Sequence, residues 1–105
     1  MQVAKGVLEM KRKIHKQGST AMVMRICGDR MKLCYDKQSG ECFRFLQVTQ
    51  EILKMGLICI AEEQVPADKD GMVEATFLDI GDFIVITNKG VRRMSQKDFQ
   101  AKYSF

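Results

Sequence analysis

The sequence predicts an α+β fold: an antiparallel β-sheet of about five to seven strands with two short helices, the second of them C-terminal. Three observations lead to this prediction. Short runs rich in β-branched and aromatic residues alternate with Gly, Asn and Asp turn signals, which is typical of antiparallel strands. Helix-capping patterns stand out at Thr49 and Ser95. A chain of 105 residues, 46% hydrophobic and 29% charged, has the size and composition of one globular domain.

The chain is therefore expected to form a single domain over residues 1–105. Its parts are a basic N-terminal segment (1–18), a β-meander (21–48) and a strand–turn–strand–helix module (79–105). Residues 3–16 stay ambiguous between an edge strand and a helix, because their apolar side chains suit either period.

Alternating side chains predict three strands in the meander, over residues 22–27, 31–35 and 42–48. Gly28-Asp29 is expected to form a two-residue hairpin turn between the first two strands. The turn signals of residues 36–40 are expected to bring the chain back as the third strand. The three strands should then pair in chain order.

This arrangement sets a register that brings three cations together. The first turn pairs Arg25 with Lys32, and the second pairs Lys32 with Arg44. The three side chains would form one row on the face opposite the apolar side chains. Because like charges facing one another across strands cost stability, the row suggests a site for phosphate or carboxylate. Two alternatives stay open: a one-residue shift of register, or acidic residues from 62–74 folding over the row.

The middle of the chain is predicted to hold one helix and two strands. The helix is expected over residues 50–55, ending at Gly56 in the left-handed conformation. The strands are expected at 57–60 and 72–78, separated by an acid-rich loop at 62–71.

The last part of the chain is predicted to form two strands and a helix. The elements are a β-branched strand at 83–87, a reversal at 88–90 and a returning strand at 91–94. Ser95 can then cap a helix, with Asp98 three residues further on. Because so short a helix is marginal alone, it is expected to dock on the sheet through Phe99 and Tyr103.

Residues 79–103, DIGDFIVITNKGVRRMSQKDFQAKY, resemble the C-terminal pattern of small, mostly uncharacterised proteins encoded by bacteriophages and prophages. That pattern is Gly-Asp-aromatic-Ile-Val/Ile, then Lys-Gly, a strand, and a helix with Phe and a terminal Tyr. The matching positions are Gly81, Asp82, Phe83, Ile84, Lys89, Gly90, Phe99 and Tyr103. After Lys-Gly those proteins usually carry Glu, two aromatics and Pro-Cys-Lys-Pro, where this chain has Val91 to Lys97.

The resemblance implies a phage or prophage origin and a location in the host cell cytoplasm. Small phage proteins of this kind are often non-enzymatic binders, and some inhibit host defences. Anti-CRISPR proteins occlude a defence nuclease, and other inhibitors sequester a signalling nucleotide. The resemblance therefore suggests an inhibitor whose partner is a host protein, such as a CRISPR nuclease or another effector, or an anionic nucleotide.

Charge is segregated along the chain, although the formal net charge is only +4. Residues 1–32 and 83–105 are mainly basic, and residues 51–82 are mainly acidic. Such segregation suits steering toward a polyanion or a charged protein, unless the blocks neutralise one another across the fold. The candidate partner- or anion-binding residues are Arg25, Lys32, Arg44, Lys11, Arg12 and Lys13.

The basic N-terminal half also supports an alternative function, a nucleic-acid-binding accessory or regulatory protein. Proteins that bind single strands combine cations with exposed aromatic side chains, whereas Tyr35, Phe43 and Phe45 are expected on the core face. A homo-oligomer also stays open.

No motif points to catalysis, and we expect no enzyme activity, cofactor or metal. His15 is the only histidine, and neither a P-loop nor a G-x-G-x-x-G fingerprint occurs. Cys27, Cys34, Cys42 and Cys59 lack the short paired spacing of zinc sites, and we expect reduced, buried thiols. No apolar run approaches the roughly 18 residues of a membrane span, and no signal-peptide pattern is seen. We therefore expect a cytoplasmic protein without a membrane partner.

Overall fold

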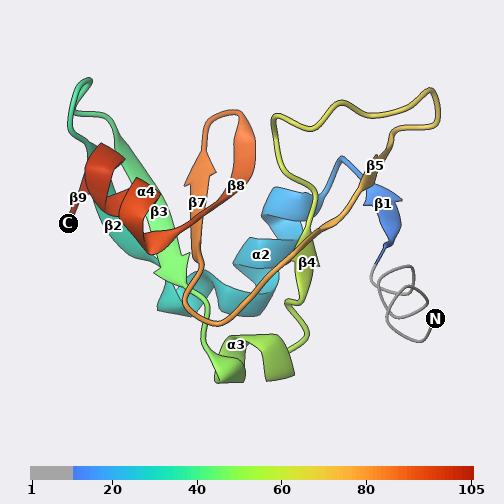
Figure 1. The fold of residues 1–105 in the computed structure, drawn as a ribbon, viewed down its shortest axis with the longest axis horizontal. Helices are drawn as coiled ribbons and strands as arrows, with labels where there is room; N and C mark the ends of the chain where they lie inside the picture. The colour runs from blue at the N-terminus through green and yellow to red at the C-terminus, as the bar shows by residue number, and fades with distance from the viewer. Residues whose placement is uncertain (1–10) are drawn as a thin grey trace.

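The computed structural model describes residues 11–105 and shows the predicted α+β class (Figure 1). A five-stranded antiparallel sheet has the order β8-β7-β3-β2-β9, and two smaller antiparallel sheets pair β1 with β5 and β4 with β6. The strands are β1 Lys13–His15, β2 Lys32–Asp36, β3 Cys42–Gln47, β4 Cys59–Ile60, β5 Met72–Glu74, β6 Thr76–Phe77, β7 Phe83–Thr87, β8 Gly90–Met94 and β9 Tyr103–Ser104. The helices are α2 Ser19–Cys27, the 3₁₀ turn η1 Gly28–Arg30, α3 Gln50–Lys54 and α4 Gln96–Lys102. The expectations for residues 3–10 lie outside the described part.

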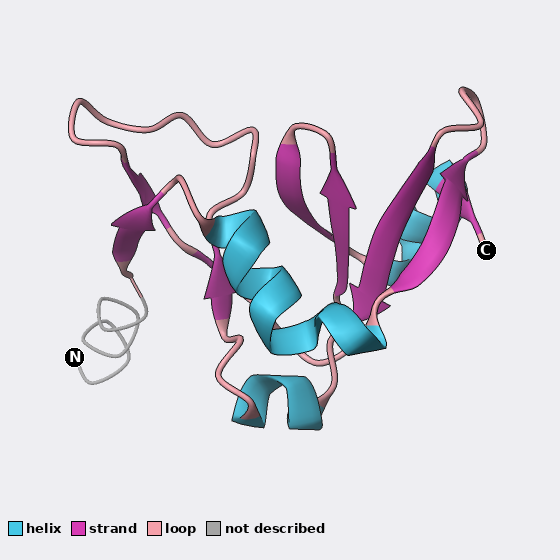
Figure 2. Cartoon of the chain, turned by 180° about the vertical axis from the view of Figure 1, so that it is seen from behind, coloured by secondary structure: helices cyan, strands magenta, loops and turns pink. Residues whose placement is uncertain are grey.

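The five-stranded sheet has two faces, and one helix packs on part of each. Residues paired across neighbouring strands share a face, so the register places Phe45 on one face and Leu46 and Ile84 on the other. Helix α4 packs on the first face and helix α2 on the second, here called the α4 face and the α2 face; Figures 1 and 2 show the two helices on opposite sides. Two buried clusters result, one around Phe99 and one around Val23.

Helix α2 occupies the stretch for which a strand was predicted, so that prediction was wrong. The buried side chains of the helix are Ser19, Val23 and Cys27, which recur every four residues. That spacing forms one helical face, and it packs against Leu46 and Ile84 of the sheet. Of the alternating side chains, Met22 and Ile26 stand four residues apart and pack beside this helical face. The described chain therefore has three α-helices where two were expected.

Neither of the two predicted turns sets the expected register. Residues 28–30 continue α2 as the turn η1 instead of forming a hairpin. In the second turn, Oδ1 of Asp36 accepts hydrogen bonds from the backbone N–H groups two and three residues ahead, at 2.8 and 3.0 Å. Gly40 has a φ of 75°, which favours glycine. Lys32 therefore pairs with Phe45 and not with Arg44.

This is the one-residue shift that was left open, and it moves Lys32 to the other face of the sheet. Lys32 lies on the α4 face with Phe43 and Phe45, whereas Arg44 lies on the α2 face. Tyr35 also lies on the α2 face and is 46% exposed, so the expectation that it shares the core face with the phenylalanines was wrong.

The remaining elements largely confirm the sequence-based predictions. Thr49 caps α3 by accepting a hydrogen bond from the backbone N of Ile52, and Gly56 follows with a φ of 105°. Ser95 caps α4 by accepting a hydrogen bond from the backbone N of Asp98. The strands predicted at 57–60 and 72–78 are present but shorter, and the second is divided into β5 and β6.

Two adjacent glutamates hold the acidic loop against β8. Glu62 accepts hydrogen bonds from the backbone N of Arg93 at 2.8 Å and from Oγ1 of Thr76 at 2.9 Å. Glu63 pairs with Arg92, with 2.5 Å between Oε1 and Nη2. Both carboxylates therefore have structural partners.

Candidate ligand pocket

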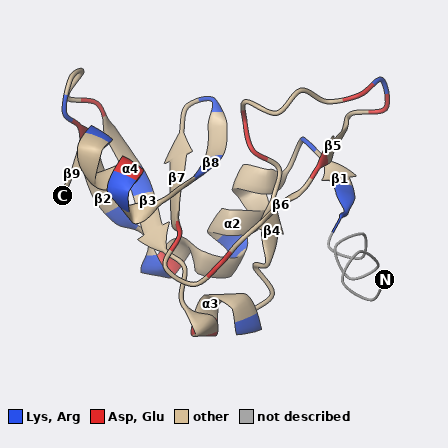
Figure 3. Ribbon diagram, viewed as in Figure 1, with Lys and Arg blue, Asp and Glu red and all other residues tan. Residues whose placement is uncertain are grey.

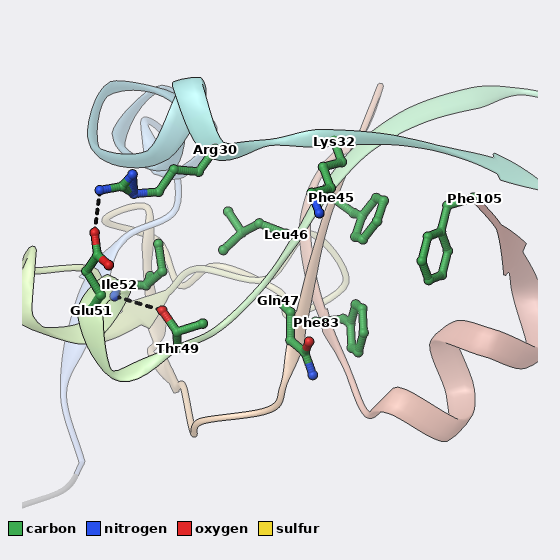
Figure 4. A pocket seen from close by; sticks show the side chains of 10 residues that line it. All are labelled: Arg30, Lys32, Phe45, Leu46, Gln47, Thr49, Glu51, Ile52, Phe83 and Phe105. Carbon is green, nitrogen blue, oxygen red and sulfur yellow. Dashed lines mark hydrogen bonds and ion pairs between the residues drawn. The ribbon is translucent and has the colours of Figure 1, made fainter.

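A cavity of about 410 Å³ lies where β2 and β3 approach α3, at one end of the α4 face (Figure 4). Ligand pockets commonly measure roughly 300–1,000 Å³, so the cavity can hold a small molecule. Its lining side chains come from segments far apart in the sequence. They are Arg30, Lys32, Phe45, Leu46, Gln47, Thr49, Glu51, Ile52, Phe83 and Phe105.

Two cations approach the cavity from consecutive elements. Arg30 ends η1, Lys32 begins β2, and Met31 between them is extended, with φ −73° and ψ 140°. Alternate residues of an extended chain point to the same side, so both cations line the same cavity. Within residues 11–105, Lys32 takes part in none of the ion pairs. Its ammonium is therefore available to an anion.

Arg30, in contrast, already has an acidic partner across the cavity. Its Nη2 lies 2.5 Å from Oε1 of Glu51, which is in the first turn of α3. The Thr49 cap sets where that helix begins and so places Glu51 opposite η1. Both side chains stay open to solvent, 45% exposed for the arginine and 68% for the glutamate.

Three phenylalanine rings form the other side of the cavity. The rings of Phe45 and Phe83 have centroids 6.0 Å apart and planes 25° apart. Phe105 lies 5.0 Å from Phe45 and is 70% exposed, so much of its ring is accessible. Phe99 of α4 supports the group from within the core, 4.8 Å from Phe45. Aromatic faces of this kind stack against planar rings.

The cavity can thus hold a planar ring and an anionic group at the same time. Figure 4 shows Lys32 between the Arg30–Glu51 pair on one side and the phenylalanine rings on the other. Gln47 adds an amide whose Nε2 donates to the carbonyl of Gly81 at 3.4 Å.

Of the residues in the predicted cationic row, the structure brings only Lys32 to this cavity. Arg25 is an exposed residue of α2, and Arg44 is exposed on the α2 face of the sheet. The predicted alignment of Arg25, Lys32 and Arg44 was therefore wrong, because it needed a strand at 22–27 and a register that does not form. Lys11 and Arg12 are exposed before β1, away from the cavity lining, and Lys13 lies in β1.

Ion pairs between the charge blocks neutralise much of the segregated charge. Within the part of the chain that the structure describes, four of the five ion pairs join the acidic segment 51–82 to a basic segment. They are Lys13–Asp68, Arg30–Glu51, Arg92–Glu63 and Arg93–Asp82. Figure 3 shows the Lys and Arg residues spread over separate elements. The interpretation in which the blocks offset one another is the one that the structure favours.

Sequence reasoning missed three important residues of the cavity: Arg30, Glu51 and Phe105. A local signal for Arg30 was present in the sequence, because Arg30 and Lys32 stand two residues apart at the start of a predicted strand and would point to the same side. Glu51 and Phe105 carried no such signal, since only the folded chain brings them to the same place.

Metal-binding groups, thiols and membrane-spanning helices were also expected to be absent or buried, and the described residues bear on each. No cluster of three His, Cys, Asp or Glu side chains within residues 11–105 could hold a metal ion. Cys27, Cys34 and Cys59 are buried as expected, whereas Cys42 is exposed, so the expectation was wrong for that thiol. Among residues 11–105, no helix has the length and apolar character needed to cross a membrane.

Comparisons with protein-family models, with curated proteins and with solved structures found no match to this chain.

Proposed function

We propose that the protein is a non-enzymatic binding protein whose cavity takes a small anionic ligand with a planar ring, of the nucleotide class. One observation carries the proposal: the ammonium of Lys32, which forms no ion pair within residues 11–105, stands beside the aromatic wall of Phe45, Phe83 and Phe105 in a cavity of about 410 Å³. A nucleotide offers the matching groups, because its base can stack on phenylalanine and its phosphate can bind the ammonium.

Ring stacking and the hydrogen bond to Lys32 are each expected to contribute measurably to the affinity for a small ligand. Stacking of a base on an aromatic side chain contributes about 1–3 kcal/mol. A hydrogen bond between charged groups contributes about 1.5–3 kcal/mol. Both contributions need to be present together, because immobilising the ligand costs free energy that neither offsets alone.

The resemblance of residues 79–103 to phage proteins suggests a biological setting for such binding. In that setting the protein would sequester a host signalling nucleotide and so inhibit a host defence. Sequestration requires binding alone, with no bond made or broken. We favour this over occlusion of a host protein, because the cavity offers both a ring-stacking wall and a cation.

Nucleic-acid binding is less well supported by the arrangement of charges. Arg44 and Lys32 lie on opposite faces of the sheet, and Lys13 is paired with Asp68. A nucleic-acid site needs several cations along one surface, since the phosphate backbone supplies most of the affinity.

The test is calorimetric titration with the four nucleoside 5′-monophosphates, on the wild type and on Lys32→Glu. Because Lys32 is exposed, the variant is expected to fold normally, and its circular dichroism and thermal transition should match the wild type. Its affinity should fall by at least about tenfold. Lys69→Glu, in the acidic loop, is the matched control and should bind like the wild type.

Two results would contradict the proposal. One is the absence of binding by the wild type to all four nucleotides at millimolar concentration; the other is equal affinity of the wild type and Lys32→Glu. Titration with an oligonucleotide between 50 and 200 mM salt addresses the alternative, which predicts a steep loss of affinity over that range.

A further inference from the structure

We infer that the ligand of this cavity carries a doubly charged phosphate monoester, which Arg30 and Lys32 bind together after the phosphate displaces Glu51 from Arg30. This inference rests on the proposed function, and it adds the charge class of the ligand and a competitor built into the site.

The Arg30–Glu51 pair has the properties of a contact that a ligand can replace. It consists of one short contact, Nη2 to Oε1 at 2.5 Å, and both side chains are substantially exposed. Exposed ion pairs of this kind contribute little, because water screens them and two long side chains must be held in place. A phosphate offers more to the same guanidinium, since its oxygens can accept two parallel N–H bonds.

The position of the two cations then selects the charge of the ligand. Arg30 and Lys32 are separated by one extended residue and line one cavity. A ligand with one negative charge is matched by Lys32 alone and leaves Glu51 on Arg30. A ligand with two negative charges on one phosphate attracts both cations, and Glu51 can turn toward solvent on the exposed side of α3.

A charge series on one base tests the inference in the full-length protein. The probes are a nucleoside 5′-monophosphate, the corresponding 3′,5′-cyclic monophosphate and the free nucleoside, with the base that binds most tightly. At pH 8 they carry two, one and no negative charges. The wild type should bind the monophosphate most tightly and the nucleoside most weakly. Because the second pKa of a phosphate monoester is about 6, the affinity for the monophosphate should fall between pH 8 and pH 5 relative to the cyclic compound.

Two variants separate the roles of the ion-pair partners. Arg30→Gln should lower the affinity for the monophosphate about tenfold and change the affinity for the cyclic compound by less than about twofold. Glu51→Gln should raise the affinity for the monophosphate by up to about fivefold, and it should raise the affinity for the cyclic compound by less. Asp29→Asn changes the net charge as Glu51→Gln does, but Asp29 does not line the cavity. This control should leave the ratio of the two affinities unchanged.

The outcomes distinguish this inference from the function on which it rests. If Lys32→Glu abolishes binding while Arg30→Gln and Glu51→Gln leave the monophosphate-to-cyclic ratio unchanged, nucleotide binding stands and the inference is wrong. If Asp29→Asn shifts the ratio as much as Glu51→Gln, the effect is general electrostatics and the inference is also wrong. If no probe binds the wild type, both are wrong.

Discussion

The ring of Phe99 lies 4.4 Å from the ring of Phe83, centroid to centroid, with the two planes inclined by only 12°. Phe99 comes from α4 and is 0% exposed, and Phe83 begins β7. This stack attaches the short C-terminal helix to the sheet, as the sequence predicted. The stack also supports the aromatic side of the cavity, because Phe83 is one of the residues that line the cavity.

Replacing Phe99 by Ala should lower the free energy of unfolding by about 3–5 kcal/mol, because it removes a fully buried ring and leaves a void under α4. Urea denaturation followed by circular dichroism measures this. Gln100→Ala, an exposed residue on the same helix, is the control and should change stability by no more than about 0.5 kcal/mol. Equal stability of Phe99→Ala and the wild type would show that α4 is not docked in this way.

Replacing Phe105 by Ala should reduce ligand affinity without much effect on folding. The residue is 70% exposed, so only part of its surface is lost from the core, but the ring is part of the cavity wall. Loss of one stacking partner should lower the affinity for the nucleotide about tenfold, as measured by calorimetric titration. Phe105→Trp should bind the nucleotide, because it keeps an aromatic ring at this position. An affinity unchanged in Phe105→Ala would place the ligand ring elsewhere.

The four cysteines should differ sharply in reactivity in the folded protein. Burial is the main cause that raises the pKa of the Cys34 thiol to about 11, and burial also raises the pKa of Cys27. Thiolates are the reactive form, so these thiols should resist a colorimetric thiol reagent at pH 8, whereas exposed Cys42 should react quickly. Cys42→Ser should remove the fast phase, and denaturant should release the slow thiols. A second fast thiol in the native protein would contradict the burial described.

Asp36 should make stability dependent on acid pH. Backbone N–H groups of Ser39 and Gln38, together with Lys102, hold the pKa of its carboxyl below the usual value. Because the pKa is lower in the folded than in the unfolded chain, the stabilisation is complete above the unfolded value of about 4 and is lost as the pH falls below it.

The comparison that tests this is Asp36→Asn against the wild type, by thermal unfolding from pH 7 to pH 2. The wild type should be the more stable at pH 7, and the difference should shrink below about pH 4. Asp29→Asn is the control, because the wild-type carboxylate of Asp29 accepts no hydrogen bond within residues 11–105. The difference in stability between Asp29→Asn and the wild type should not shrink below about pH 4. A difference between Asp36→Asn and the wild type that is constant with pH would contradict the assigned cause.

Local sequence by itself determined the elements whose signals lie within a few residues of one another. The caps at Thr49 and Ser95 each use a side-chain oxygen and a backbone N–H three residues ahead, so the chain needs no distant partner to specify them. The β-branched run of β7 and the tight reversal into β8 are equally local. For this reason the α+β class, the two strands and the capped helix of the C-terminal module could be predicted correctly. Tyr103 was expected to lie on that helix, but it begins β9 and pairs with Asp36 of β2, a contact that only the folded sheet provides.

Tertiary structure decided the features that depend on what a segment packs against. Val23 and Cys27 suit a strand or a helix until the α2 face of the sheet offers a surface that a helical stripe can cover. The register of β2 and β3 depended on hydrogen bonds to Asp36 and on the backbone of Gly40, which pattern alone did not specify.

The cavity belongs to the same class of feature. Lys32 could be named as a candidate cation from sequence, but its neighbours Glu51 and Phe105 stand far from it in the chain and reach it only through the folded sheet. Spacing along a chain reports contacts between near neighbours, whereas a binding site depends on which distant side chains the core holds together. The sequence therefore identified a useful charge, and the fold decided what that charge faces.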